Sequence, residues 1–178
     1  EAAWKGHAAC VSALLAAGAE KDVLDKRGDT ALHDAARYGR AACVDALLAA
    51  GAKKDVKSND GDTELHDAAR NGHAACLDAL LAVGAKKDVQ NNNGRTALFL
   101  AVEYGRTACV EALLAAGAQK DVANKDGWTA LHRAAINGHA ACVSALLAAG
   151  AKKDVKNRDG WTALHQAADK RHAACVSA

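Results

Sequence analysis

The sequence predicts an all-α solenoid of stacked helix-turn-helix units, and three observations lead to this prediction. Cysteines recur every 33 residues along the whole chain, and turn glycines and helix-start leucines keep the same spacing without any insertion. Hydrophobic residues make up 51% of the chain, yet aromatic residues make up only 3% and methionine is absent. Ala therefore dominates the apolar set, which favours closely spaced helices over one thick core. No apolar run approaches the roughly 18 residues of a membrane span.

We expect residues 1–178 to form one continuous array, because the repeat never loses its register. A unit of this kind buries its apolar face only against its neighbours, so the units must stack. The first and last units are incomplete, and Arg171 stands where the other units have Gly, as is common in terminal repeats. The expected units span residues 1–26, 27–59, 60–92, 93–125, 126–158 and 159–178.

The unit at residues 126–158 illustrates the first half of the pattern. Asp126-Gly127 is a two-residue turn signal. Thr129 can N-cap a short first helix, because its side-chain oxygen accepts a hydrogen bond from a free N–H of the first turn. Gly138 is expected to end that helix, because glycine adopts the left-handed conformation at low cost.

A second helix is predicted over residues 140–147. Its Val143, Leu146 and Leu147 lie on one side, which is the apolar stripe of a helix that packs on a neighbour. The chain after Gly150 is expected to run extended to the next turn. Each unit is thus a turn followed by an antiparallel helix pair.

The recurring T-x-L-H, G-H and L-L-x-x-G-A motifs resemble the ankyrin repeat family across essentially the whole chain. This resemblance implies an ankyrin-type solenoid whose helix pairs are joined by β-turn or hairpin loops. The family favours Pro after the Thr, and Pro suits the first helical turn, so each helix start is less preorganised here. The residues at that position are Ala31, Glu64, Ala97, Ala130 and Ala163.

The cysteines are expected to be reduced and buried. Stacked helices lie roughly 8–10 Å apart, whereas a disulfide needs Cα atoms within about 7 Å. Free buried thiols favour an intracellular protein, in the cytoplasm or the nucleus. The six positions are Cys10, Cys43, Cys76, Cys109, Cys142 and Cys175.

The eight histidines follow the same spacing and are not expected to bind a metal, because zinc needs three or four ligands that converge on one point. The resemblance implies instead that T-x-L-H histidines hydrogen-bond the turns. Pairs such as His33-Asp34 are adjacent along a helix and do not face each other, so no catalytic group is expected. We predict a non-enzymatic protein with no cofactor and no small-molecule substrate.

The charge pattern limits the class of partner. A net charge of +2 gives no reason to expect nucleic acid or a membrane. Lysines recur in each unit and are each followed by Asp, which favours a solvated face with local charge pairing over a site for an acidic partner. They are Lys21, Lys54, Lys87, Lys120 and Lys153.

Three positions of the unit vary while the rest scarcely changes: after the turn Gly, after the T-x-L-H His, and before the Gly that ends the first helix. We expect them to form one continuous edge, the variable strip, which in the family corresponds to the concave binding surface. Trp, Tyr and Arg, which occur here, are enriched at binding hot spots. The candidate residues are Trp4, Asp29, Asp34, Arg37, Tyr38, Asp62, Asp67, Arg70, Arg95, Leu100, Glu103, Tyr104, Trp128, Arg133, Ile136, Trp161 and Gln166.

The sequence therefore predicts a monomeric module that binds another protein through the variable strip. A basic partner segment is expected against the acidic N-terminal half, and an apolar anchor against the C-terminal half. Trp128 and Trp161 have an alternative role, which is to shield the turns of neighbouring units. Two other functions remain open: an engineered or consensus-like scaffold without a native ligand, and a structural spacer in a larger protein.

Overall fold

The computed structural model describes residues 1–177, in which twelve helices and no strand occur, so the all-α prediction is confirmed. The first helices of the units are α1 (Ala2–Lys5), α3 (Ala31–Arg37), α5 (Glu64–Asn71), α7 (Ala97–Glu103), α9 (Ala130–Asn137) and α11 (Ala163–Asp169). The second helices are α2 (Ala8–Ala16), α4 (Ala41–Ala49), α6 (Ala74–Ala82), α8 (Thr107–Ala115), α10 (Ala140–Ala148) and α12 (Ala173–Val176).

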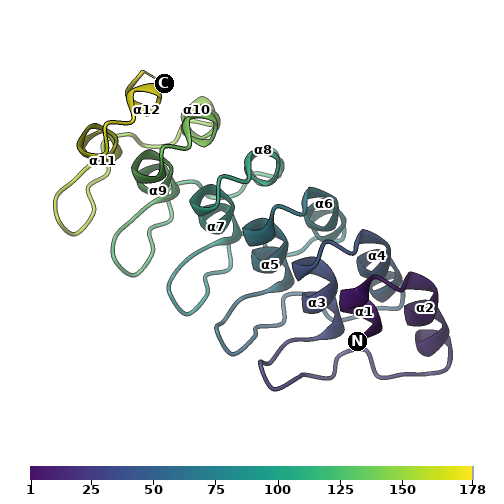
Figure 1. Cartoon of the computed structure of the whole chain (residues 1–178). Coiled ribbons are helices and arrows are strands. Elements are labelled where there is room, and N and C mark those ends of the chain that lie inside the picture. The colour runs from purple at the N-terminus through teal and green to yellow at the C-terminus, as the bar shows by residue number, and fades with distance from the viewer. Residues whose placement is uncertain (178) are drawn as a thin grey trace.

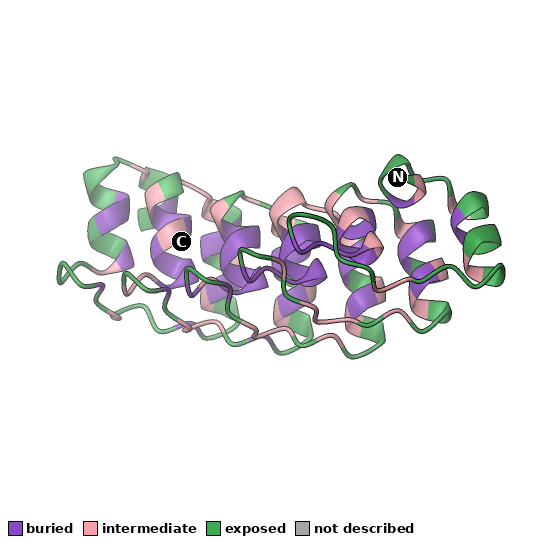
Figure 2. Ribbon diagram, turned by 90° about the horizontal axis from the view of Figure 1, so that it is seen from below, coloured by how far each residue is buried: buried purple, intermediate pink, exposed green. Residues whose placement is uncertain are grey.

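The first helices stack in one row and the second helices in another, with the two chain ends at opposite ends of the array (Figure 1). The long loops between units all project to the same side (Figure 1). The buried residues lie mainly on the helices, while the loops are largely exposed or intermediate in burial (Figure 2). Each unit thus packs on its neighbours, as the repeat predicts.

The core is built from the same positions in successive units. In the fifth unit these are Leu131 from α9 and Cys142, Val143 and Leu146 from α10, all buried. Small Ala side chains between them let the helices approach closely. Cys10 is exposed and the other five cysteines are buried, and all six are free. Burial raises the pKa of the Cys76 and Cys109 thiols to about 11.

The first helices α3, α5, α7, α9 and α11 each begin at a Thr N-cap, as predicted, whereas α1 follows Glu1. The Thr129 hydroxyl accepts from the His132 backbone, and His132 Nδ1 accepts from the Thr129 N–H at 3.3 Å, which forms a capping box. The other ring nitrogen donates to a backbone carbonyl of the next unit: His132 Nε2 lies 3.0 Å from the carbonyl oxygen of Trp161. The T-x-L-H histidines therefore bond the turns, and His33, His66 and His132 join neighbouring units as well.

The glycines that end the first helices are required for two reasons. Gly138 has φ 72°, in the left-handed region, as expected. A Cβ there would lie 2.8 Å from the His172 ring of the next unit. That ring fills the space and donates from Nε2 to the carbonyl oxygen of Ile136 at 3.2 Å. Arg171, at the corresponding position of the last unit, adopts φ 58°.

The loops after the second helices contain turns, and none of the described residues forms a strand there. A carboxylate in four of these loops bonds the next unit. For example, Asp55 Oδ1 accepts from the Lys86 N–H at 2.8 Å, and Asp88 Oδ1 from the Gln119 N–H at 2.8 Å. The units are therefore connected at the helix starts, at the helix ends and along the loops.

Candidate functional site

The structure exposes only part of the variable strip. Trp4, Tyr38, Tyr104 and Trp161 are exposed, with 39–48% of their surface accessible. Other members are intermediate in burial: Asp34, Arg37, Arg70, Arg95, Glu103, Trp128, Arg133 and Ile136. Phe99, outside the strip, is the one buried member of the Trp, Tyr and Phe side chains in the described residues.

Five members of the strip are buried, so the expectation that they face solvent is wrong. Asp29, Asp62, Asp67, Leu100 and Gln166 are each at most 6% exposed. The physical reason differs with the side chain. The three carboxylates are covered by arginines that they bind, and Leu100 is a buried apolar side chain of α7.

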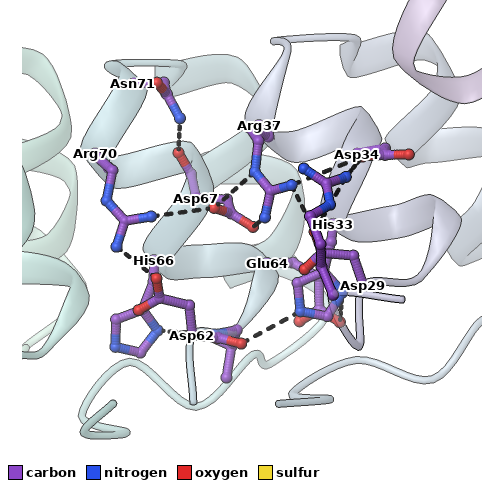
Figure 3. Close-up of polar contacts among 12 residues, drawn as sticks. Asp29, His33, Asp34, Arg37, Asp62, Glu64, His66, Asp67, Arg70 and Asn71 are labelled. Carbon is purple, nitrogen blue, oxygen red and sulfur yellow. Dashed lines mark hydrogen bonds and ion pairs between the residues drawn. The ribbon is translucent and has the colours of Figure 1, made fainter. Parts of the chain in front are cut away.

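The carboxylates of the N-terminal half form ion pairs with arginines of the same strip (Figure 3). Arg37 donates from Nε to Asp67 Oδ1 at 3.1 Å and from Nη2 to Asp67 Oδ2 at 3.0 Å, and it also binds Asp29. Arg70 binds Asp62 and contacts Asp67. These carboxylates are not available to a basic partner in the way that the sequence suggested.

In this cluster, burial and ion pairing have opposite effects on the pKa values of the charged side chains. Burial raises the pKa of Asp67 to about 6, although Arg37 acts to lower it. Burial alone would lower the pKa of Arg37, but its bonds to Asp29 and Asp67 raise it, so the guanidinium stays charged. Breaking such a pair on one side leaves a buried charge without a partner.

Glu64 is a buried carboxylate that lies outside the predicted strip. Its Oε2 accepts from the Asp55 N–H at 3.0 Å, and Asp55 has the unusual φ of 62°. Its Oε1 has no hydrogen-bond partner in the described residues and lies 3.6 Å from His33 Nδ1. Burial raises the pKa of Glu64, with the His33 ring acting in the opposite direction. In the sequence, the only sign of this buried carboxylate is that Glu64 stands where the other units have Ala.

The C-terminal half of the strip is built around one aromatic ring. The guanidinium carbons of Arg95 and Arg133 each lie 5.7 Å from the centroid of the Phe99 ring. Both arginines share Glu103, at 3.1 Å and 3.4 Å. Arg133 also lies 5.3 Å from the centroid of Trp128, so that indole packs on its own unit.

A possible metal site was tested on this geometry. Ligand atoms of Asp29, His33 and Asp67 lie within 4.8 Å of one another. The guanidinium of Arg37 already binds both carboxylates, so it supplies the positive charge that an ion would bring. The cluster is therefore best described as an ion-pair network.

Two of the recurring lysines lie near the end of the second helix of the next unit. Lys87 Cε lies 4.0 Å, and Lys120 Cε 3.8 Å, from where a Cβ on Gly117 and Gly150 would be. A cation at the end of a second helix is favourable there, because the helix C-terminus carries partial negative charge. The expected pairing of each Lys with the following Asp is wrong in general, since among the described residues only Lys54 approaches its Asp, at 3.8 Å.

Comparisons with known proteins agree with this architecture. A family model for ankyrin repeats in three copies matches residues 1–91, 51–124 and 117–178. A crystal structure of an ankyrin repeat domain from Acinetobacter baumannii AYE is similar over 99% of this chain and 92% of that chain, with a TM-score of 0.90 and 32% identity. The curated proteins contain no match.

The described residues contain no helix that is long and apolar enough to cross a membrane. Ankyrin repeats generally mediate protein–protein binding and are typically non-enzymatic. The predicted ankyrin-type solenoid is confirmed by the family match and by the similar structure. This chain belongs to the ankyrin repeat family.

Proposed function

We propose that the chain binds another protein through the exposed part of the variable strip. The observation that carries this proposal is the placement of its aromatic side chains. Tyr38, Tyr104 and Trp161 are exposed at strip positions of three different units, although a Tyr or Trp could have been buried to stabilise the fold. Exposed Trp and Tyr side chains are frequent anchors of protein interfaces.

The mechanism is rigid presentation of these anchors. Side chains from one unit bond the backbone of the next, as His33 does with the Asp62 carbonyl oxygen at 3.3 Å and His66 with that of Arg95 at 3.0 Å. A surface that is ordered before binding loses little conformational entropy on association. The proposal requires no cofactor and no catalytic group.

The experiment compares three forms of the chain as baits, with bound proteins quantified by mass spectrometry. The first bait is the parent. The second carries Tyr38→Ala, Tyr104→Ala and Trp161→Ala. The third is a matched control with Asp45→Ala and Asp78→Ala on the exposed side of the second helices, plus Glu111→Ala.

The proposal predicts a partner that binds the parent and the control equally. Loss of one buried aromatic anchor typically costs about 2 kcal/mol, which is roughly a 30-fold loss of affinity, so the triple strip variant should bind at least that much more weakly. If the control bait no longer binds the partner while the triple strip variant still does, binding would be assigned to the opposite face.

A further inference from the structure

The turn that begins at Ser58 departs from the other turns at its first residue. In the next turn along the chain, Asn91 Oδ1 accepts the N–H groups of Asn93 and Arg95, each at 3.0 Å. Asn124 and Asn157 make the same pair of bonds in their turns, and Asp25 makes them with a carboxylate. The corresponding residue of the remaining turn is Ser58, whose shorter side chain makes neither bond in the described residues.

Because Ser58 has no side-chain amide, the preceding turn also lacks an N–H donor of the kind that the next turn receives from Asn91. Asn91 Nδ2 donates to Asp62 Oδ1 at 2.7 Å, which joins the turn that begins at Ser58 to the turn that begins at Asn91. One unit earlier, Asp29 occupies the place of Asp62, and Ser58 occupies the place of Asn91. Asp29 is 3% exposed, and its Oδ1 has no hydrogen-bond partner among the described residues. A buried acceptor without a partner costs about 1–3 kcal/mol.

A cavity lies at this point, between the turns of the second and third units. Its volume is about 430 Å³, and both Asp29 and Ser58 line it. Arg37 and Arg70 line it as well, so it opens on the variable strip beside the ion pairs drawn in Figure 3. It therefore adjoins the surface assigned above to partner binding.

The polar groups that remain without a partner beside Ser58 can all be satisfied by one kind of chemical group. Asp29 Oδ1 needs an N–H donor, while the N–H groups of Asp60 and Asp62 need an acceptor. In the neighbouring unit a single primary carboxamide, that of Asn91, meets all three requirements. A carboxylate would lack the donor, and an ammonium group would lack the acceptor.

We propose that the cavity between Asp29 and Ser58 is a binding site for a primary carboxamide, presented by an Asn or Gln side chain of a protein partner. The inference rests on the proposed function, because it specifies a contact that the partner makes with the strip. The carboxamide replaces the one that the chain itself supplies at Asn91. Specificity follows from the buried groups, since a ligand without the N–H donors leaves Asp29 without a partner.

Acetamide is the probe, and the measurement is the change in the amide NMR signals of the full ¹⁵N-labelled chain during titration. The parent should show saturable shifts centred on Asp29, Asp60 and Asp62, with an affinity on the order of tens of millimolar for so small a ligand. N,N-dimethylacetamide, which cannot donate, and acetate should not produce them.

Ser58→Asn is the decisive variant, because it fills the cavity with the carboxamide that the other units carry. The shifts should disappear, while the melting temperature should rise by about 3 °C or more through the added hydrogen bonds. Ser144→Asn, the same change at an exposed site of α10, should alter neither the shifts nor the melting temperature. Loss of binding together with higher stability cannot come from unfolding.

Three results would overturn the inference: no saturable shift in the parent, equal shifts with dimethylacetamide or acetate, or unchanged shifts in Ser58→Asn. The titration involves no protein partner. A failure here therefore leaves the proposed function standing, and a failure to find a partner leaves the carboxamide site standing.

Discussion

Arg37 and Asp67 hold the second and third units together through a bidentate ion pair, with Nε and Nη2 of the guanidinium at 3.1 Å and 3.0 Å from the two carboxylate oxygens. The side chain of Asp67 is fully buried, whereas that of Arg37 is 21% exposed. The arginine therefore covers the carboxylate and is the partner that remains in reach of solvent.

Arg37→Gln should destabilise the array by about 3 kcal/mol, because it removes the bidentate partner of the buried Asp67 carboxylate and one partner of the buried Asp29 carboxylate. Chemical denaturation of the parent and the variant measures the difference in the free energy of unfolding. Arg158→Gln, at an exposed turn, is the control and should stay within about 0.5 kcal/mol of the parent. Equal effects of the two changes would show that the pair does not join the units.

Glu64→Gln should stabilise the protein at neutral pH by about 1–2 kcal/mol, since it removes a charge that is buried without a full set of partners. The raised pKa of Glu64 means that the folded state prefers the protonated form, so the parent loses stability as the pH rises above the ordinary value of 4.5. The advantage of the variant should therefore grow from about pH 4 to about pH 7.

The check is the difference in the free energy of unfolding at each pH, because the other titrating groups are common to both proteins and cancel. Glu111→Gln, at an exposed position of α8, should show no such trend. A difference for Glu64→Gln that stays constant over this pH range would mean that the buried carboxylate is not the cause.

Gly138→Ala should cost more than Gly84→Ala, although the two glycines have similar φ angles of 72° and 76°. Both changes place a Cβ in left-handed backbone, at roughly 1–2 kcal/mol. Only at Gly138 does the new atom meet the His172 ring, at 2.8 Å, while no other group of the described residues lies within 4 Å at Gly84.

The expected excess for Gly138→Ala is at least about 1 kcal/mol, as for other overpacked sites. Unfolding of the two variants under the same conditions measures it. Identical losses would contradict the role of the helix-ending glycine as the contact point for the next unit.

The thiols should differ in reactivity according to their place in the array. Cys10 is exposed, whereas Cys76 and Cys109 are buried and have pKa values raised to about 11, which leaves little of the reactive thiolate. Brief treatment of the native protein with iodoacetamide, followed by peptide mass spectrometry, should therefore label Cys10 first. All six should react after denaturation, and rapid native labelling of Cys76 would show that the core is misplaced.

The fold was predictable from the sequence because one pattern of helix start and helix end recurs in register. Thr129 and Gly138 each act within a single unit, so their roles follow from local chemistry. Stacking then follows, because a single unit cannot bury its own apolar face.

The candidate site was less predictable, because exposure depends on the neighbouring unit. Asp62 and Trp128 occupy the same position of the repeat, yet Asp62 is buried by its pairing with Arg70 and by Asn91 of the next turn. The effect of Ser58 likewise appears only where it faces Asp29. Contacts between units at variable positions are not encoded in the period of the repeat.

The central claim is that the exposed variable strip binds the partner, and hydrogen–deuterium exchange of the chain with and without a captured partner tests it most directly. A partner bound there should slow exchange at the ends of the first helices beside Tyr38 and Tyr104. It should also slow exchange at the turns, which end at Thr30, Thr63, Thr96, Thr129 and Thr162. Exchange in α4, α6, α8 and α10 should stay unchanged. Protection confined to those second helices, with none at the turns, would contradict the claim.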